Sequence, residues 1–95
     1  MLESTIEKHM FKQAKNYGLL CRKVKWIGRR GAPDRLLHGV FVELKRPGAK
    51  PEPHQLREHD LMRKAGMRVE VVDSIEGVDE LINEIRSQNT SANDN

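Results

Sequence analysis

A strand segment and a short apolar run, separated by Gly39, predict a β-hairpin, and they constrain the fold more than any other feature of the chain. The strand segment covers residues 34–38 and the apolar run covers residues 40–45. Successive side chains of a strand point to opposite faces, so Glu43 and Lys45 share one face, while the residue between them points into the core. The hairpin therefore presents a carboxylate and an ammonium group side by side.

A second carboxylate belongs to the same hairpin. Asp34 follows Pro33 and opens the first strand, so the turn brings it to the sheet edge that holds Glu43 and Lys45. Two carboxylates and an ammonium group form a site for a hard divalent cation and the water that it activates, which points to hydrolysis of a phosphodiester. The plainer alternatives are a turn former after proline for Asp34 and a solvated strand residue for Glu43.

The size and charge of the chain restrict what it can be. With 95 residues it forms one small domain, and 37% hydrophobic against 33% charged residues gives a thin core that self-association could extend. The formal net charge of +3 and the sequence pI of about 9.2 suit a polyanionic partner. The single cysteine, Cys21, excludes an internal disulfide and a cysteine-based zinc site within one chain.

The amino terminus is charged and polar, so no signal peptide is expected. No apolar stretch approaches the roughly 20 residues that span a bilayer. We therefore expect a soluble cytoplasmic protein with no membrane partner.

Hydrophobic periodicity and turn residues predict the remaining elements. In chain order they are a helix at 2–17, a strand at 19–26, the hairpin strands, a helix at 53–65, a strand at 67–72 and a final helix through Val78, Leu81, Ile82 and Ile85. The first three strands are expected to form an antiparallel meander, and the helical crossover favours a parallel fourth strand. The sequence thus predicts an α/β (α+β) fold, a small mixed sheet flanked by helices. The domain is expected at residues 1–87 and a disordered polar tail at residues 88–95.

These motifs resemble those of the PD-(D/E)XK nuclease superfamily, whose name motif is matched by Pro33-Asp34 and Glu43-Leu44-Lys45. Within the superfamily the chain is similar to VRR-NUC domains, the virus-type replication-repair nucleases. Four segments carry the closer similarity: residues 3–7, residues 30–34, residues 42–45, and the helix that Gln55 leads and Ala65-Gly66 ends.

The resemblance covers about residues 3–86 and implies a restriction-endonuclease-like αβββαβ core. It implies a stand-alone module like the phage versions, which are similar to Holliday-junction resolvases and act as homodimers on branched DNA. The expected setting is the cytoplasm of a bacterial or phage-infected cell.

The resemblance also implies a set of metal ligands. Asp34 and Glu43 would bind Mg²⁺ or Mn²⁺, with Glu3 reached directly or through water and the backbone carbonyl of Leu44 as a further ligand. An unpaired charge at Glu43 would be costly in so apolar a strand, which favours the metal interpretation. Glu7, one turn after Glu3, is the alternative in the first helix, although Glu3 fits the family pattern better.

Asp34, Glu43, Lys45 and Gln55 are the expected catalytic residues. Lys45 would lie near the attacking water and orient it, lower its pKa or stabilise the charge on phosphorus. The alternative for Lys45 is a salt bridge without chemistry. Gln55 would hydrogen-bond the phosphate, the water or Lys45, or else it is an ordinary polar residue of a first helical turn.

Basic residues flank the acidic cluster in the sequence and are expected to hold DNA phosphates. They are Lys25, Arg29, Arg30, Arg46 and Lys50. Any one of these residues alone is more often a solvated surface cation, but five of them around the acidic cluster favour binding to phosphates. Trp26 could stack on an unpaired base, although packing in the core or in a dimer contact fits better.

The four histidines do not have the spacing of a zinc site, and we interpret them as surface or packing residues. They are His9, His38, His54 and His59.

We therefore expect a metal-dependent endonuclease that acts on branched or structured DNA as a homodimer, without an organic cofactor. A basic module that binds nucleic acid without cleaving it is the alternative from another class. A nuclease for flaps, nicked DNA or single-stranded DNA is the alternative within the same class.

Overall fold

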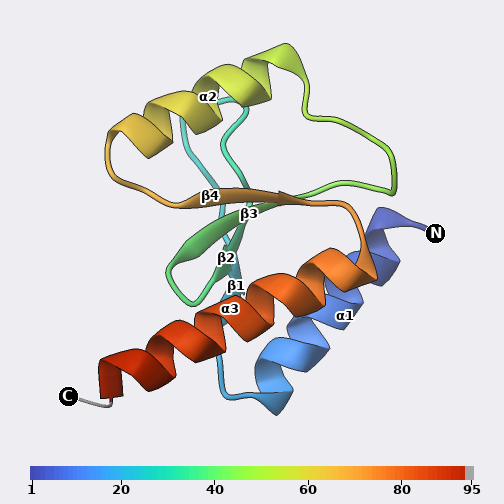
Figure 1. Cartoon of the computed structure of the whole chain (residues 1–95). Coiled ribbons are helices and arrows are strands. Elements are labelled where there is room, and N and C mark those ends of the chain that lie inside the picture. The colour runs from blue at the N-terminus through green and yellow to red at the C-terminus, as the bar shows by residue number, and fades with distance from the viewer. Residues whose placement is uncertain (94–95) are drawn as a thin grey trace.

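A computed structural model describes residues 1–93 of the chain. Its elements, in chain order, are α1 (Glu3–Asn16), β1 (Cys21–Lys23), β2 (Arg35–Leu37), β3 (Val40–Leu44), α2 (Pro53–Lys64), β4 (Val69–Val72) and α3 (Ile75–Asn93). The four strands form one sheet, with α2 over one face and α1 and α3 over the other (Figure 1). The predicted α+β class and the predicted order of elements are confirmed.

The sheet has the strand order β1-β2-β3-β4. The first three strands pair antiparallel and β4 pairs parallel to β3, as the sequence predicts. Antiparallel neighbours need only short connections, whereas the parallel strand enters the sheet through the α2 crossover. The register places Glu43 beside Val71 of β4 and Val42 beside Arg35 of β2.

His38 and Gly39 form the tight turn between β2 and β3. Both residues have positive φ angles, 48° for His38 and 89° for Gly39, as the two central positions of a type I′ turn require. Glycine adopts this backbone conformation without steric cost. The turn fixes the pairing of Leu37 with Val40 and thereby decides which β3 side chains face α2.

The hydrophobic core lies between the sheet and the layer formed by α1 and α3. Ile6, Met10 and Ala14 recur at every fourth residue of α1 and are fully buried. Val42 and Leu44 of β3 join the same core, together with Val78, Leu81, Ile82 and Ile85 of α3. Because side chains alternate along β3, Glu43 points to the opposite face, toward α2.

Three element ends differ from the predictions. The strand expected at residues 19–26 shortens to β1, because the chain leaves the sheet after the Val24 amide donates to the Asp34 carbonyl at 2.9 Å. The strand expected at residues 67–72 begins only at Val69. At the other end, α3 continues through residues 88–93, where we expected a disordered tail. Asp94 and Asn95 lie outside the described residues.

Within residues 1–93, no helix combines the length and the hydropathy that crossing a bilayer requires.

Candidate active site

Glu43 is a buried carboxylate at the centre of the face that α2 covers. The side chains of three other residues lie close to its two oxygens. Gln55 Nε2 donates to Glu43 Oε2 at 3.4 Å, and Lys45 Nζ lies 3.9 Å from the same oxygen. His59 Nε2 lies 3.7 Å from Oε1. The hairpin and α2 thus enclose one carboxylate between an amide, an ammonium group and an imidazole.

The surroundings of Glu43 favour its protonated form. Burial raises the pKa of its carboxyl to about 7, with the charges of Asp34 and Glu3 adding to the rise and those of Lys45 and Arg35 opposing it. Two further carboxylates therefore lie near enough to repel an ionised Glu43. A cation in this neighbourhood would stabilise the ionised form.

Gln55 makes both a helix-capping contact and a contact with Glu43. Its Oε1 accepts a hydrogen bond from the Glu52 amide at 2.8 Å, which closes a capping box at the start of α2. Its Nε2 is thereby turned toward Glu43. One side chain therefore caps a helix and contacts the buried carboxylate, and its catalytic role stays a prediction.

The other two predicted acidic ligands are exposed. Asp34 precedes β2, and its Oδ1 lies 2.7 Å from Arg35 Nη1. Glu3 is the first residue of α1 and shares with Lys45 a hollow of about 400 Å³. Among residues 1–93, no three side chains of His, Cys, Asp or Glu are placed to share one metal ion. The three carboxylates thus form a shared electrostatic neighbourhood and not a preformed set of ligands.

Glu7, the alternative to Glu3, is engaged elsewhere. It forms ion pairs with Arg35 and, at 3.1 Å, with Lys23. The hydrogen bond from Arg35 is the largest influence on the Glu7 carboxyl and holds its pKa below the usual range. Arg35 is itself buried and also pairs with Asp34. The geometry therefore assigns Glu7 to a structural ion pair between α1 and β2, which leaves Glu3 nearer to the site.

Arg35 was not singled out in the sequence. Its burial could have been suspected from the sequence, because a cation immediately follows the Pro-Asp motif at the start of a strand. An inward-facing cation at such a position needs an anionic partner.

The last ligand expected from the sequence, Leu44, ends β3 with its side chain in the core. The role of its backbone carbonyl stays a prediction.

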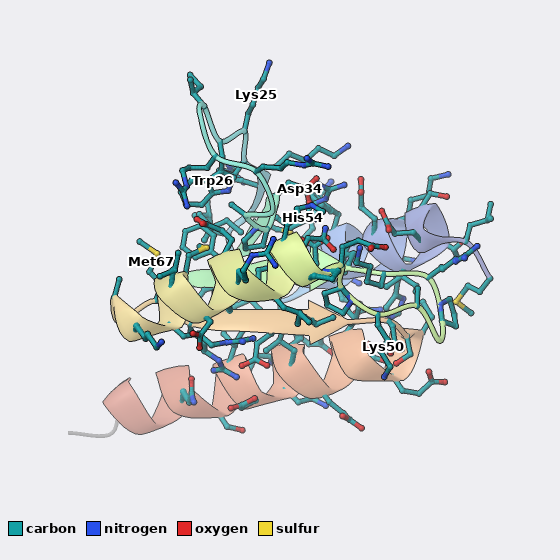
Figure 2. The ribbon with its side chains drawn as sticks, turned by 90° about the horizontal axis from the view of Figure 1, so that it is seen from above. Lys25, Trp26, Asp34, Lys50, His54 and Met67 are labelled. Atoms are coloured by element: carbon teal, nitrogen blue, oxygen red, sulfur yellow. The ribbon has the colours of Figure 1, made fainter. Side chains whose placement is uncertain are left out.

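The predicted phosphate-binding cations lie on two sides of the carboxylates. Lys25 and Arg30 are exposed on the loop between β1 and β2, which stands beside α2 with Lys25 extended away from the ribbon (Figure 2). Arg46 and Lys50 follow β3 and line the hollow that contains Glu3. Arg29 differs from the others, because its Nη2 pairs with the buried Glu58 of α2 at 2.5 Å.

The loop between β1 and β2 is anchored to its surroundings. Trp26 Nε1 donates to the Pro33 carbonyl at 2.7 Å, and the Trp26 ring lies 5.5 Å from the Phe41 ring, centroid to centroid. Trp26 therefore packs against the sheet, as we favoured. A Cβ at Gly31, where φ is +88°, would lie 2.7 Å from the carbonyl oxygen of His54. Only glycine lets the loop approach the first turn of α2 this closely.

The four histidines have different environments. His59 is fully buried beside Glu43, so the interpretation as a surface or packing residue missed its contact with the site. Burial lowers its pKa most, with the charges of Arg63 and Lys45 acting in the same direction and a backbone hydrogen bond with Gly31 opposing them. His9 Nε2 pairs with Asp79 Oδ1 at 2.7 Å and joins α1 to α3. His38 occupies the hairpin turn and His54 the first turn of α2.

Cys21 lies in a separate hollow of about 540 Å³ between α1 and β1. Burial raises the pKa of its thiol to about 11, which leaves it protonated and unreactive at neutral pH. The site therefore consists of carboxylates, amides and cations, without a thiol nucleophile.

Comparison with known proteins identifies the relatives of this chain. No family model matches the chain. "Putative nuclease p44" of Acyrthosiphon pisum secondary endosymbiont phage 1 is 46% identical over 77 residues, which cover 76% of this chain and 83% of the relative. A solved VRR_NUC domain structure superposes with a TM-score of 0.74 at 45% identity and covers 85% of this chain and 94% of the other.

The mixed sheet, with a Pro-Asp before β2 and Glu-Leu-Lys at the end of β3, defines a nuclease domain of the PD-(D/E)XK class. Within that class the chain belongs to the VRR-NUC family.

Proposed function

We propose that this protein is a metal-dependent endonuclease that hydrolyses phosphodiester bonds in branched or structured DNA. One observation carries the proposal. A glutamate with a pKa of about 7 is buried in the sheet beside a lysine and a glutamine, within the electrostatic influence of two exposed carboxylates. A chain of this size gains no stability from such a group, so its presence favours a role in chemistry.

The residues present fit a hard divalent cation. Glu43 supplies a fixed, buried oxygen, while Asp34 and Glu3 are exposed and can change rotamer to bring a second and third oxygen toward it. The carbonyl of Leu44 is a further oxygen donor at the end of the same strand. Mg²⁺ or Mn²⁺ held there would lower the pKa of a coordinated water and neutralise charge on the phosphate.

Lys45 and Gln55 would act on the reacting phosphate. Lys45 lines the hollow, and its ammonium group lies 3.9 Å from Glu43 Oε2. It would stabilise negative charge that develops on phosphate oxygens. Gln55 is held by the Glu52 amide, so its Nε2 keeps one direction and can orient the water or the phosphate. Both groups would act from rigid elements of the fold.

Cations on both sides of the carboxylates would hold the DNA backbone. Lys25 and Arg30 would contact phosphates on one side, and Arg46 and Lys50 on the other. Arg29 would join them only by leaving Glu58. Such contacts carry no base code, which suits recognition of DNA shape.

A homodimer would suit a branched substrate, because a two-fold protein presents two sites to a two-fold junction. The thin core of a 95-residue chain supports self-association. Sedimentation velocity with and without a four-way junction measures the stoichiometry. A monomer in both conditions would remove the dimer from the proposal and leave the chemistry standing.

The decisive experiment is a cleavage assay on a panel of four-way junctions, flaps, nicked duplexes and single strands, with Mg²⁺ or Mn²⁺. Asp34→Ala and Lys45→Ala should abolish metal-dependent cleavage while DNA binding persists, which would exclude the binding-only alternative. A wild-type protein that nicks no DNA form with either metal would overturn the proposed function. The preferred form in the panel decides between junctions and the other substrates.

A further inference from the structure

His59 is a fully buried imidazole that lies beside the Glu43 carboxylate. The residue is 0% exposed, and neither Nδ1 nor Nε2 makes a well-formed hydrogen bond, although the Gly31 backbone interacts with the ring closely enough to raise its pKa against the effect of burial. It lies on the buried side of α2 between Glu58 and Met62. An unsatisfied polar group in the interior lowers stability, whereas a leucine or methionine of similar volume would not. Packing and one loose contact with the Gly31 backbone do not by themselves explain a histidine at this position.

The ring faces the carboxylate of the proposed metal site. His59 Nε2 lies 3.7 Å from Glu43 Oε1. Gln55, one helical turn earlier, donates to the other oxygen of the same carboxylate. Residues four apart share a helix face, so α2 presents one donor to each oxygen of Glu43. A movement of about 1 Å or less would bring His59 within hydrogen-bond distance.

We propose that His59 is a positioning residue, which holds the Glu43 carboxylate by donating a hydrogen bond from Nε2 to Oε1. The proposal rests on the metal-dependent function proposed above. With Gln55 on one oxygen and His59 on the other, the carboxylate cannot rotate freely and keeps its remaining lone pairs toward the side of Asp34 and Glu3. Partners of this kind orient the ligands of a metal and raise its affinity.

His59 does not itself act on the substrate. Its side chain is fully enclosed, so neither DNA nor a water in the hollow reaches the ring. The same enclosure separates it from solvent cations, and residues 1–93 offer no three-residue metal cluster that includes it. Its effect must therefore pass through Glu43.

This role makes an unusual prediction for His59→Leu. Removing the poorly satisfied nitrogens should raise Tm or leave it unchanged, while Mn²⁺ affinity falls about tenfold or more. A packing residue would show the reverse, a lower Tm and unchanged affinity. His59→Gln keeps a side-chain N–H donor and should restore most of the affinity. Met62→Leu, on the same buried face of α2, is the matched control and should change Mn²⁺ affinity little.

Isothermal titration with Mn²⁺ in the absence of DNA measures the affinity, and thermal melts without metal measure Tm. In cleavage, His59→Leu should lower kcat with little change in KM for DNA. A His59→Leu protein that is less stable or unfolded, or one that binds Mn²⁺ as the wild type does, would overturn the positioning role. A wild-type protein that binds no Mn²⁺ would instead overturn the proposed function, and this inference with it.

Discussion

Gln55 joins the start of α2 to the buried carboxylate of Glu43. Its Oε1 accepts from the Glu52 amide at 2.8 Å, and its Nε2 donates to Glu43 Oε2 at 3.4 Å. The helix cap thereby sets the direction of an amide that faces the proposed site. Stability and catalysis at this position can be separated by comparing the two halves of the cap.

Gln55→Ala should destabilise the fold by about 1 kcal/mol, through loss of the cap, and should reduce cleavage at least about tenfold. Glu52→Ala removes the other half of the same capping box and should cost similar stability. Its cleavage rate should fall less than that of Gln55→Ala, because Glu52 borders the hollow that contains Glu3 and Lys45 but makes no described contact with Glu43. Urea unfolding and single-turnover cleavage measure the two effects. Equal losses of activity in both variants would reduce Gln55 to a structural residue.

The elevated pKa of Glu43 predicts a pH dependence of opposite sign to that of a salt-bridged carboxylate. The folded protein holds this proton up to about pH 7, whereas the unfolded chain releases it near 4.5. Between these values the folded state binds more protons, so the contribution of Glu43 to the unfolding free energy falls as pH rises, by up to about 3 kcal/mol.

Glu43→Gln should abolish that contribution. The variant should therefore gain stability relative to the wild type between pH 5 and pH 8, as measured by urea unfolding at both values without metal. Because Mn²⁺ binds the ionised carboxylate, its affinity for the wild type should rise over the same interval. Parallel pH profiles of the two proteins would show that Glu43 has an ordinary pKa in the folded state.

Glu3 and Glu7 should separate into a functional and a structural glutamate. Glu7→Ala leaves Arg35 buried without its α1 partner and should cost about 2–4 kcal/mol of stability. Glu3→Ala loses only a favourable charge at a helix start, worth less than about 1 kcal/mol, but should slow cleavage strongly. Chemical unfolding and cleavage rates test both. Slow cleavage by a well-folded Glu7 variant, with an active Glu3 variant, would reverse the assignment.

Salt dependence should reveal which cations contact DNA. Each phosphate contact that is lost should reduce the slope of log affinity against log salt by about 0.9, so Arg30→Ala and Lys50→Ala should each show this change. Arg29→Ala should change the slope less, because Arg29 is paired with Glu58. Lys64→Ala, which removes a lysine 3.0 Å from Asp60 on α2, is the control and should leave the slope unaltered. Fluorescence anisotropy over a range of KCl concentrations makes the measurement.

Local patterns were sufficient for the order of elements and the hairpin. Gly39 between two strand segments predicted the turn, and the alternation in β3 placed Glu43 on the face opposite Val42 and Leu44. These features depend on side chains a few residues apart, so they can be read from the chain. The strand β1 is shorter than predicted and the helix α3 is longer. Strand and helix ends depend on the hydrogen bonds and contacts that neighbouring elements supply, which local patterns do not show.

The contacts of the site depend on distant partners, and these were missed. Arg35 with Glu7, Arg29 with Glu58 and His59 with Glu43 join residues 16 to 29 positions apart. No periodicity marks such pairs, because burial of one charge is tolerated only once another element supplies its partner.

By itself, the sequence determined the fold class, the hairpin, and the placement of Glu43 and Lys45 side by side at the end of one strand. The alternation of side chains along a strand and the residue preferences of tight turns depend only on neighbouring residues, so they hold in any protein. Only the tertiary structure decided that Glu43 is buried, that Glu7 is taken by Arg35, and that α2 turns Gln55 and His59 toward one carboxylate. Those outcomes follow from the packing of α2 on one face of the sheet and of α1 and α3 on the other (Figure 1). Burial and the neighbouring charges then determine the pKa of Glu43.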